Sequence, residues 1–129
     1  MAALDCSLDV TVSRQRVGAI LAFMAAGYIL GSDLTSRGVP ANLHPAIQEL
    51  QRRYSTRPGK ADAALVDELG LFDYLSSRFA VYGTPEMCHR QMAAAHAAGV
   101  EQIMFSVSLA ADPLETVSLL GERVLPAVH

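Results

Sequence analysis

Apolar positions along this chain recur mostly at helical spacing, and short apolar or alternating runs separate the helical stretches. Residues Leu8–Val12 alternate apolar and polar side chains, which predicts a strand. Ser13 is placed to cap a helix and precedes a long apolar stretch, so we expect a helix over Arg14–Leu30 that ends at Gly31. Apolar residues cover most of the circumference of this helix, which is typical of a helix buried on several faces.

Two further helices are expected in the middle of the chain. Residues Leu43–Tyr54 form an amphipathic pattern, and a second pattern covers Ala61–Ser77. Gly70 weakens the second helix by about 1 kcal/mol relative to alanine. These two helices connect the first predicted strand to the next one.

A strand, a glycine turn and a helix follow in close succession. The apolar run Phe79–Tyr82 ends at Gly83, and Thr84 is placed to cap a helix whose first residue is Pro85. Gly99 is suited to end this helix in a left-handed conformation.

A third strand and a last helix complete the pattern. We expect the strand over Gln102–Leu109 and the helix from Pro113, with Asp112 as its cap, Glu115 in a capping-box position and Pro126 as its end. Strands joined by a helix lie parallel with a right-handed crossover. The sequence therefore predicts an α/β protein with a parallel sheet.

Three short motifs in this part of the chain resemble the carboxyl end of the bacterial-luciferase-like oxidoreductases. The motifs are Gly83-Thr84-Pro85-Glu86, Ala98-Gly99-Val100-Glu101-Gln102-Ile103 and Val124-Leu125-Pro126-Ala127. The likeness extends over Phe79–Val128 and, more loosely, over Leu8–Ser77. Members of this family are TIM-barrel enzymes that use a flavin or a deazaflavin coenzyme.

The resemblance implies a partial (β/α)8 TIM barrel, namely carboxyl-terminal βα units with parallel strands and two extra connecting helices. Only three strands are visible, whereas a closed barrel needs eight and typically about 250 residues. We therefore expect residues 1–129 to be one domain that corresponds to the last third or so of such a barrel. The expected function is part of a flavin- or deazaflavin-dependent oxidoreductase or monooxygenase, incomplete on its own.

The resemblance also sets the expected cofactor and partners. FMN or a deazaflavin coenzyme is implied, but the earlier part of the family carries most of the cofactor-binding residues, including a glycine-rich phosphate-binding stretch that is not found here. We expect this chain alone to bind the cofactor poorly or not at all. An unfinished sheet has open edges, so we expect a homo-oligomer, docking to a fuller barrel subunit, or a sheet covered by the two connecting helices.

Two alternatives remain open at the level of the sequence. One is a non-catalytic α/β module that acts in self-association or in docking to a full barrel subunit. The other is a flavodoxin-like domain, which is less favoured because such domains need about five parallel strands.

Polar residues near the carboxyl ends of the predicted strands are the candidate cofactor-binding residues. Thr84, Ser106 and Ser108 are placed there, and ligands of parallel α/β folds bind at that end of the sheet. The favoured alternative is structural, because caps and turns use the same residue types. No catalytic residue is identified.

The helix after Thr84 also carries residues that could ligate a metal. Cys88, Met92 and His96 recur at helical spacing and share one face. A metal site needs three or four ligands, so a partly buried helix with a surface histidine is the expected structure, and no metal is predicted.

Composition narrows the classes of partner and compartment. The chain has 129 residues, of which 51% are hydrophobic and 18% charged, and its net charge of -3 gives no reason to expect nucleic acid. The longest apolar run, Val17–Leu30, is shorter than the roughly 20 residues of a membrane span. Two distant cysteines, Cys6 and Cys88, do not form a disulfide framework, which favours a reducing cytoplasm.

Overall fold

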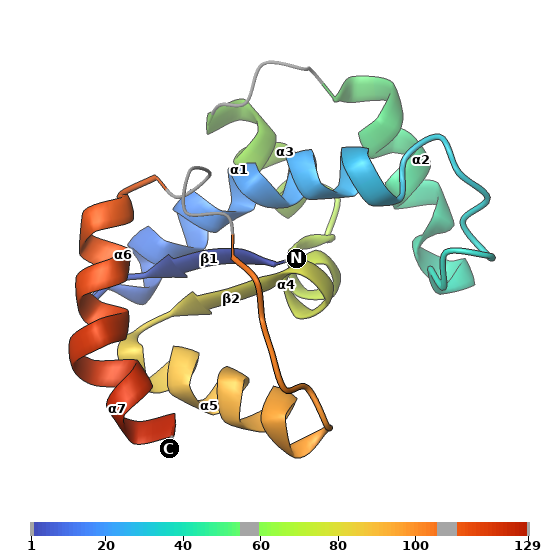
Figure 1. Ribbon diagram of the computed structural model, residues 1–129. Helices are drawn as coiled ribbons and strands as arrows, with labels where there is room; N and C mark the ends of the chain where they lie inside the picture. The colour runs from blue at the N-terminus through green and yellow to red at the C-terminus, as the bar shows by residue number, and fades with distance from the viewer. Residues whose placement is uncertain (1, 55–59, 106–110, 129) are drawn as a thin grey trace.

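Two short parallel strands lie at the centre of the protein, and helices cover both of their faces (Figure 1). The structure is a computed structural model that describes residues 2–54, 60–105 and 111–128. Strand β1 (Ala3–Cys6) pairs in parallel with β2 (Ala80–Gly83), and the register aligns the first residues and the last residues of the two strands. A third segment adds one isolated parallel bridge between Phe105 and Ala2.

The helices of the described residues differ in length and in the way that they end. The chain forms α1 (Val10–Tyr28), a 3-10 turn (Ala41–Leu43), α2 (His44–Arg53), α3 (Lys60–Glu68), α4 (Phe72–Phe79), α5 (Pro85–Ala97) and α6 (Pro113–Leu119). The last helix continues through a π-helical turn, η3 (Leu120–Val124), into α7 (Leu125–Val128). The expected helix Leu43–Tyr54 is confirmed as α2.

The predicted strand Leu8–Val12 is wrong. The first strand is β1, and Asp9 begins α1 because its carboxylate accepts the backbone N–H groups of Thr11 at 2.9 Å and Val12 at 3.4 Å. A side-chain cap of this kind outweighs an alternation that is only five residues long. All four residues of β1 are buried, so the real strand shows no alternation.

The single helix predicted over Ala61–Ser77 is also wrong, because α3 and α4 are separate. Gly70 adopts a φ of 67°, which is a left-handed conformation that glycine tolerates, and the N–H of Leu71 bonds the carbonyl of Val66. Gly70 therefore ends α3 rather than merely weakening a longer helix.

The predicted strand, cap and helix around Thr84 are confirmed, with the strand one residue later than expected. Thr84 caps α5 and Pro85 is its first residue. Gly99 has a φ of 95°, and the N–H of Val100 bonds the carbonyl of Ala95, which closes the helix end.

The third predicted strand, Gln102–Leu109, is found only as the bridge at Phe105. Residues 101–104 have no regular structure, and residues 106–110 lie outside the described residues. Asp112 caps α6 as predicted, through a 3.1 Å bond from the N–H of Glu115.

The predicted helix end at Pro126 is wrong, because the helix continues to Val128. Proline lacks an N–H and its ring crowds the carbonyl four residues earlier. The π-helical turn Leu120–Val124 precedes it, and the N–H of Leu125 bonds the carbonyl of Leu120. This wider turn accommodates the proline within a continuing helix.

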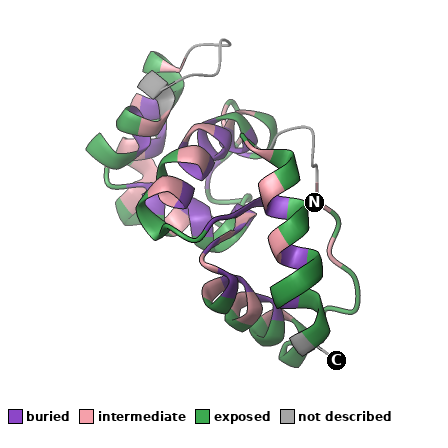
Figure 2. Cartoon of the chain, turned by 90° about the vertical axis from the view of Figure 1, so that its left-hand side faces the viewer, coloured by how far each residue is buried: buried purple, intermediate pink, exposed green. Residues whose placement is uncertain are grey.

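Each face of the sheet packs on its own hydrophobic core (Figure 2). The first core joins Ala3 of β1 to apolar side chains of α1, α2, α3 and α4, among them Val17, Leu21, Ile47, Leu50, Val66 and Leu75. The second core joins the other face to α5 and the last helix through Leu4, Cys6, Val81, Cys88, Met92, Leu120 and Val124. The sheet is therefore the middle of three layers. Helix α1 packs on one face of it, so the two connecting helices are not the only cover of that face.

The order of the strands does not confirm a partial barrel. Ser7 donates to Gly83 on the β2 side of β1, whereas the N–H groups of Ala2 and Cys6 bond groups on the opposite edge. The segment at Phe105 therefore lies on the far side of β1 from β2. In a barrel each strand neighbours the next strand in sequence, and all helices lie outside the sheet. The described residues establish a mixed α/β fold, mostly helical, with a small parallel sheet.

Among residues 2–54, 60–105 and 111–128, no helix combines the length and the apolar character needed to cross a membrane.

Candidate functional site

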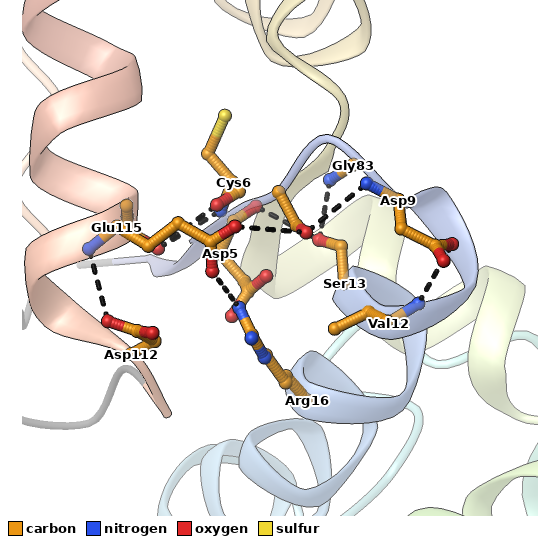
Figure 3. Close-up of polar contacts among 11 residues, drawn as sticks. Asp5, Cys6, Asp9, Val12, Ser13, Arg16, Gly83, Asp112 and Glu115 are labelled. Atoms are coloured by element: carbon orange, nitrogen blue, oxygen red, sulfur yellow. Dashed lines mark hydrogen bonds and ion pairs between the residues drawn. The ribbon is translucent and has the colours of Figure 1, made fainter.

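A buried hydroxyl joins the carboxyl ends of the two strands (Figure 3). The Ser13 Oγ accepts the N–H of Gly83 at 2.9 Å and donates to the carbonyl of Asp5 at 3.2 Å. Beyond it, the N–H of Ser7 donates to the carbonyl of Gly83 at 3.0 Å. Ser13, in the first turn of α1, thus bridges β1 and β2 at their carboxyl ends.

Two other side chains occupy the outer edges of this sheet. The Thr116 Oγ1 accepts the N–H of Cys6 at 3.2 Å and donates to its carbonyl at 3.4 Å. On the other edge, the Gln91 carboxamide accepts the N–H of Tyr82 at 3.2 Å and donates to its carbonyl at 2.7 Å. These contacts satisfy main-chain groups that would otherwise invite another strand. Self-association stays a prediction that these contacts do not test.

The Asp5 side chain is a fully buried carboxyl group at the end of β1. Neither of its oxygens has a hydrogen-bond partner among the described residues, because the Ser13 hydroxyl gives its proton to the main-chain carbonyl instead. Burial raises the pKa of Asp5, and this effect exceeds the lowering by the nearby polar hydroxyl of Ser13 and by the positive charge of Arg16. The folded environment therefore disfavours the ionised carboxylate relative to water.

An ion pair ties the last helix to α1 beside this carboxyl group (Figure 3). The Arg16 Nη1 lies 2.8 Å from the Glu115 Oε2, and the other Glu115 oxygen accepts the Ser7 hydroxyl at 3.3 Å. The bond to Glu115 raises the pKa of Arg16. The Glu115 carboxylate thus pairs with groups outside its own helix, although the capping-box pattern directs such a side chain to its own helix start.

A cleft of about 660 Å³ lies beside this ion pair. Its lining comes from α1, from α3 and from the residue that lies two positions before the last helix, and includes the four alanines Ala19, Ala63, Ala64 and Ala111. Arg14 and Arg16 also line it. Arg14 bonds Asp67 at 2.7 Å, and its guanidinium carbon lies 3.6 Å from the centre of the Phe72 ring. We call this site the arginine cleft.

The predicted binding residue Thr84 serves as a helix cap in the structure. Its Oγ1 accepts the N–H of Met87 at 3.3 Å. The Met87 side chain lies close over Gly83, since a Cβ placed at Gly83 would be 2.7 Å from the Met87 Cε. Little room therefore remains for a phosphate at this turn. Ser106 and Ser108 lie outside the described residues, so their roles as binding residues stay predictions.

The three possible metal ligands of α5 do not share one environment. Cys88 and Met92 are buried in the second core, whereas His96 is exposed. This agrees with the expected partly buried helix that carries a surface histidine. In the part of the chain that the structure describes, no group of three or more His, Cys, Asp or Glu side chains could hold a metal ion.

The contacts at the end of the sheet were not apparent from the sequence. Ser13 was expected to cap a helix, but the cap is Asp9 and the Ser13 hydroxyl bonds two strands instead. Arg16 and Glu115 are far apart in the sequence, and only the packing of the last helix beside β1 brings them together.

Neither the models of known protein families nor the curated proteins that were searched give a match to this chain. The likeness to the luciferase-like oxidoreductases therefore stays a prediction from the motifs around Gly83, Gly99 and Pro126.

Proposed function

We propose that this chain supplies the carboxyl-terminal βα units of a luciferase-like oxidoreductase or monooxygenase that uses FMN or a deazaflavin coenzyme. Three parallel segments, each followed by a helix, support the proposal together with the three motifs of the family. The proposed binding role rests on one observation, the arginine cleft, because this cleft borders the first turns of α1, the helix that follows β1. The coenzyme would supply hydride transfer or oxygen activation, and the protein would position it.

The arginine cleft fits a flat ligand that has an anionic tail. Its volume of about 660 Å³ falls within the range of small-molecule sites, and alanine side chains leave space for a ring. Arg14 and Arg16 are residues of the type that binds phosphate through paired hydrogen bonds. Asp67 and Glu115 now hold these guanidinium groups, so a phosphate would replace them as partners.

The start of α5 does not fit the phosphate of the coenzyme. Met87 covers Gly83, and the Thr84 hydroxyl already bonds the N–H of Met87. Glu86 adds a carboxylate in the first turn of the helix, where an incoming anion would be repelled. In the proposal, the arginines of the cleft bind the anionic tail and the turn at Gly83 does not.

Substitution of Arg16 is expected to weaken coenzyme binding. We expect the protein to take up FMN or the deazaflavin coenzyme weakly, with a dissociation constant of roughly 0.1 to 1 mM, because part of a site provides part of the binding energy. Arg16→Gln should weaken binding about tenfold, which is the contribution of one charge-assisted hydrogen bond. Absorbance and fluorescence titrations measure this, with Arg37→Gln as a control on an exposed loop.

Two outcomes of the titration would contradict the proposal. Uptake that Arg14→Gln and Arg16→Gln leave unchanged would show that the arginine cleft is not the site. No uptake of either coenzyme at millimolar concentration would show that this chain does not hold the coenzyme. Thermal unfolding of each variant separates a loss of binding from a loss of folding.

A second candidate is a non-catalytic α/β module that self-associates or docks to a fuller barrel subunit. The outer edge of β2, where a barrel would place its next strand, is occupied by the Gln91 carboxamide, which favours this candidate. The last helix also exposes apolar side chains, with Leu114 82% exposed and Val117 and Leu125 about half exposed. Elution at twice the monomer mass without coenzyme uptake would support this candidate over the enzyme.

A further inference from the structure

The two cysteines of the chain lie in one buried place, although they are far apart in sequence. Cys6 is the last residue of β1, and Cys88 lies in the first turn of α5. Both side chains are fully buried in the second core. In Figure 3 the Cys6 side chain points away from the polar cluster, toward the opposite side of the strand.

The sheet register brings the two thiols into each other's neighbourhood. Cys6 is aligned with Gly83 across the ladder, and the Cys88 Sγ lies 3.8 Å from the carbonyl of Gly83 and 3.8 Å from that of Asp5. Burial raises the pKa of the Cys88 thiol well above its usual value, and a direct interaction with the Cys6 thiol raises it further. Burial likewise raises the pKa of Cys6. Both thiols are therefore held in the protonated form in the resting protein, so their reaction with an oxidant is slow.

We propose that Cys6 and Cys88 form a reversible disulfide when the protein encounters a hydroperoxide such as hydrogen peroxide. With hydrogen peroxide, one thiol releases its proton and its sulfur attacks a peroxide oxygen. The O–O bond breaks, the leaving hydroxide takes up that proton, and a sulfenic acid and one water form. The second thiol then attacks that sulfur, so the S–S bond forms, the S–O bond breaks and a second water leaves. The two thiols lose two electrons and the peroxide gains them.

The bond would link the carboxyl end of β1 to the start of α5. The two ends are joined through α1, α2, α3, α4 and β2, so the disulfide closes a loop that includes more than half of the chain. A loop of this length restricts the unfolded chain strongly. The oxidised protein should melt roughly 10 °C higher than the reduced protein.

The disulfide can be detected directly by mass spectrometry. The folded protein is treated with millimolar hydrogen peroxide, the excess is removed with catalase, and free thiols are alkylated in denaturant before trypsin digestion. Cys6 lies in the tryptic peptide of residues 1–14 and Cys88 in the peptide of residues 79–90. We expect these peptides to be linked within one chain, with the loss of two hydrogen atoms and full reversal by dithiothreitol. Oxidation should be slow because both thiols are buried and protonated.

Controls in the same sample make each outcome informative. Met104 is 66% exposed, so its oxidation to the sulfoxide shows that the peroxide was active. Cys6→Ser and Cys88→Ser each retain one thiol and should give no linked peptides within one chain. Two alkylated cysteines beside oxidised Met104, a sulfinic acid on either cysteine, or a link between two chains would each overturn the proposal.

Discussion

Ser13→Ala is expected to lower the free energy of unfolding by about 3 kcal/mol. The substitution removes the hydroxyl that accepts the N–H of Gly83 and donates to the carbonyl of Asp5. Both main-chain groups lie at the buried end of the sheet, and each buried group that loses its partner costs about 1 to 3 kcal/mol. Urea unfolding followed by circular dichroism measures the change.

Ser77→Ala is the matched control for this substitution. The Ser77 hydroxyl donates to the carbonyl of Tyr74 at 2.8 Å, but it lies on an exposed face of α4. Its loss should change the free energy of unfolding by no more than about 0.5 kcal/mol. Equal effects of the two substitutions would show that the Ser13 hydroxyl does not hold the strands together. Faster amide exchange at Gly83 in Ser13→Ala would locate the damage at the bridge.

The local signals of the sequence predicted the helix ends well. Thr84, Pro85, Gly99 and Asp112 act at the positions expected of them, because each effect depends on a few adjacent residues. A cap or a left-handed glycine forms in almost any tertiary setting. The part of the fold that such residues determine was therefore predictable.

The errors arose where neighbouring residues gave a signal for two different structures. The alternation at Leu8–Val12 suited a strand, but Asp9 also suits a helix cap and the buried β1 lies just before it. The helical pattern around Gly70 predicts one helix with a weak point, yet Gly70 lies where a change of direction lets α3 and α4 both pack against α1. In each case tertiary packing decides between two local interpretations of similar strength.

The contacts of the candidate site could not be predicted from spacing along the chain. Arg16 meets Glu115, and Cys6 meets Cys88, only because the last helix and α5 pack beside and beneath β1. Long-range pairs of this kind depend on strand register and on which face each helix covers. The sequence indicated the residue types of a ligand site but not which of them lie together.

The strand order changes what the sequence resemblance can imply. In the sheet the strands lie in the order β2, β1, third segment. With this order, the connection from β1 to β2 and the connection from β2 to the third segment cross opposite faces of the sheet. The first three strands of flavodoxin-like folds have the same order. A luciferase-like barrel would instead place the third segment beside β2, where Gln91 now bonds Tyr82. The barrel proposal therefore requires that the Gln91 side chain leaves the edge of β2.

Asp5→Asn is expected to make the protein more stable at neutral pH, even though Asp5 is fully buried. The carboxylate of Asp5 has no hydrogen-bond partner among the described residues. A buried polar group of this kind costs on the order of 1 to 3 kcal/mol, and more when it is charged. An uncharged amide of nearly the same shape avoids the cost of the charge.

The pH dependence of this difference provides the sharper test. The pKa of Asp5 is raised in the folded protein above its ordinary value of 3.8. As the pH rises from 3.8 through the folded pKa, the folded state retains a proton that the unfolded state has released, so the wild-type protein loses stability. Below pH 3.8 both states are protonated and this loss is absent. The advantage of Asp5→Asn should therefore be smallest near pH 4, should grow as the pH rises through the folded pKa, and should stay constant above it.

Urea unfolding of both proteins from pH 4 to pH 8 measures that difference, and Asp73→Asn on the exposed face of α4 serves as the control. Because exposed carboxylates titrate alike in all three proteins, their contributions cancel in the comparison. A wild-type protein that is more stable than Asp5→Asn at pH 8 would contradict the argument. It would mean that the attraction of Arg16 for an ionised Asp5 exceeds the cost of burying the charge, and that the ionised Asp5 is a structural partner of Arg16 together with Glu115.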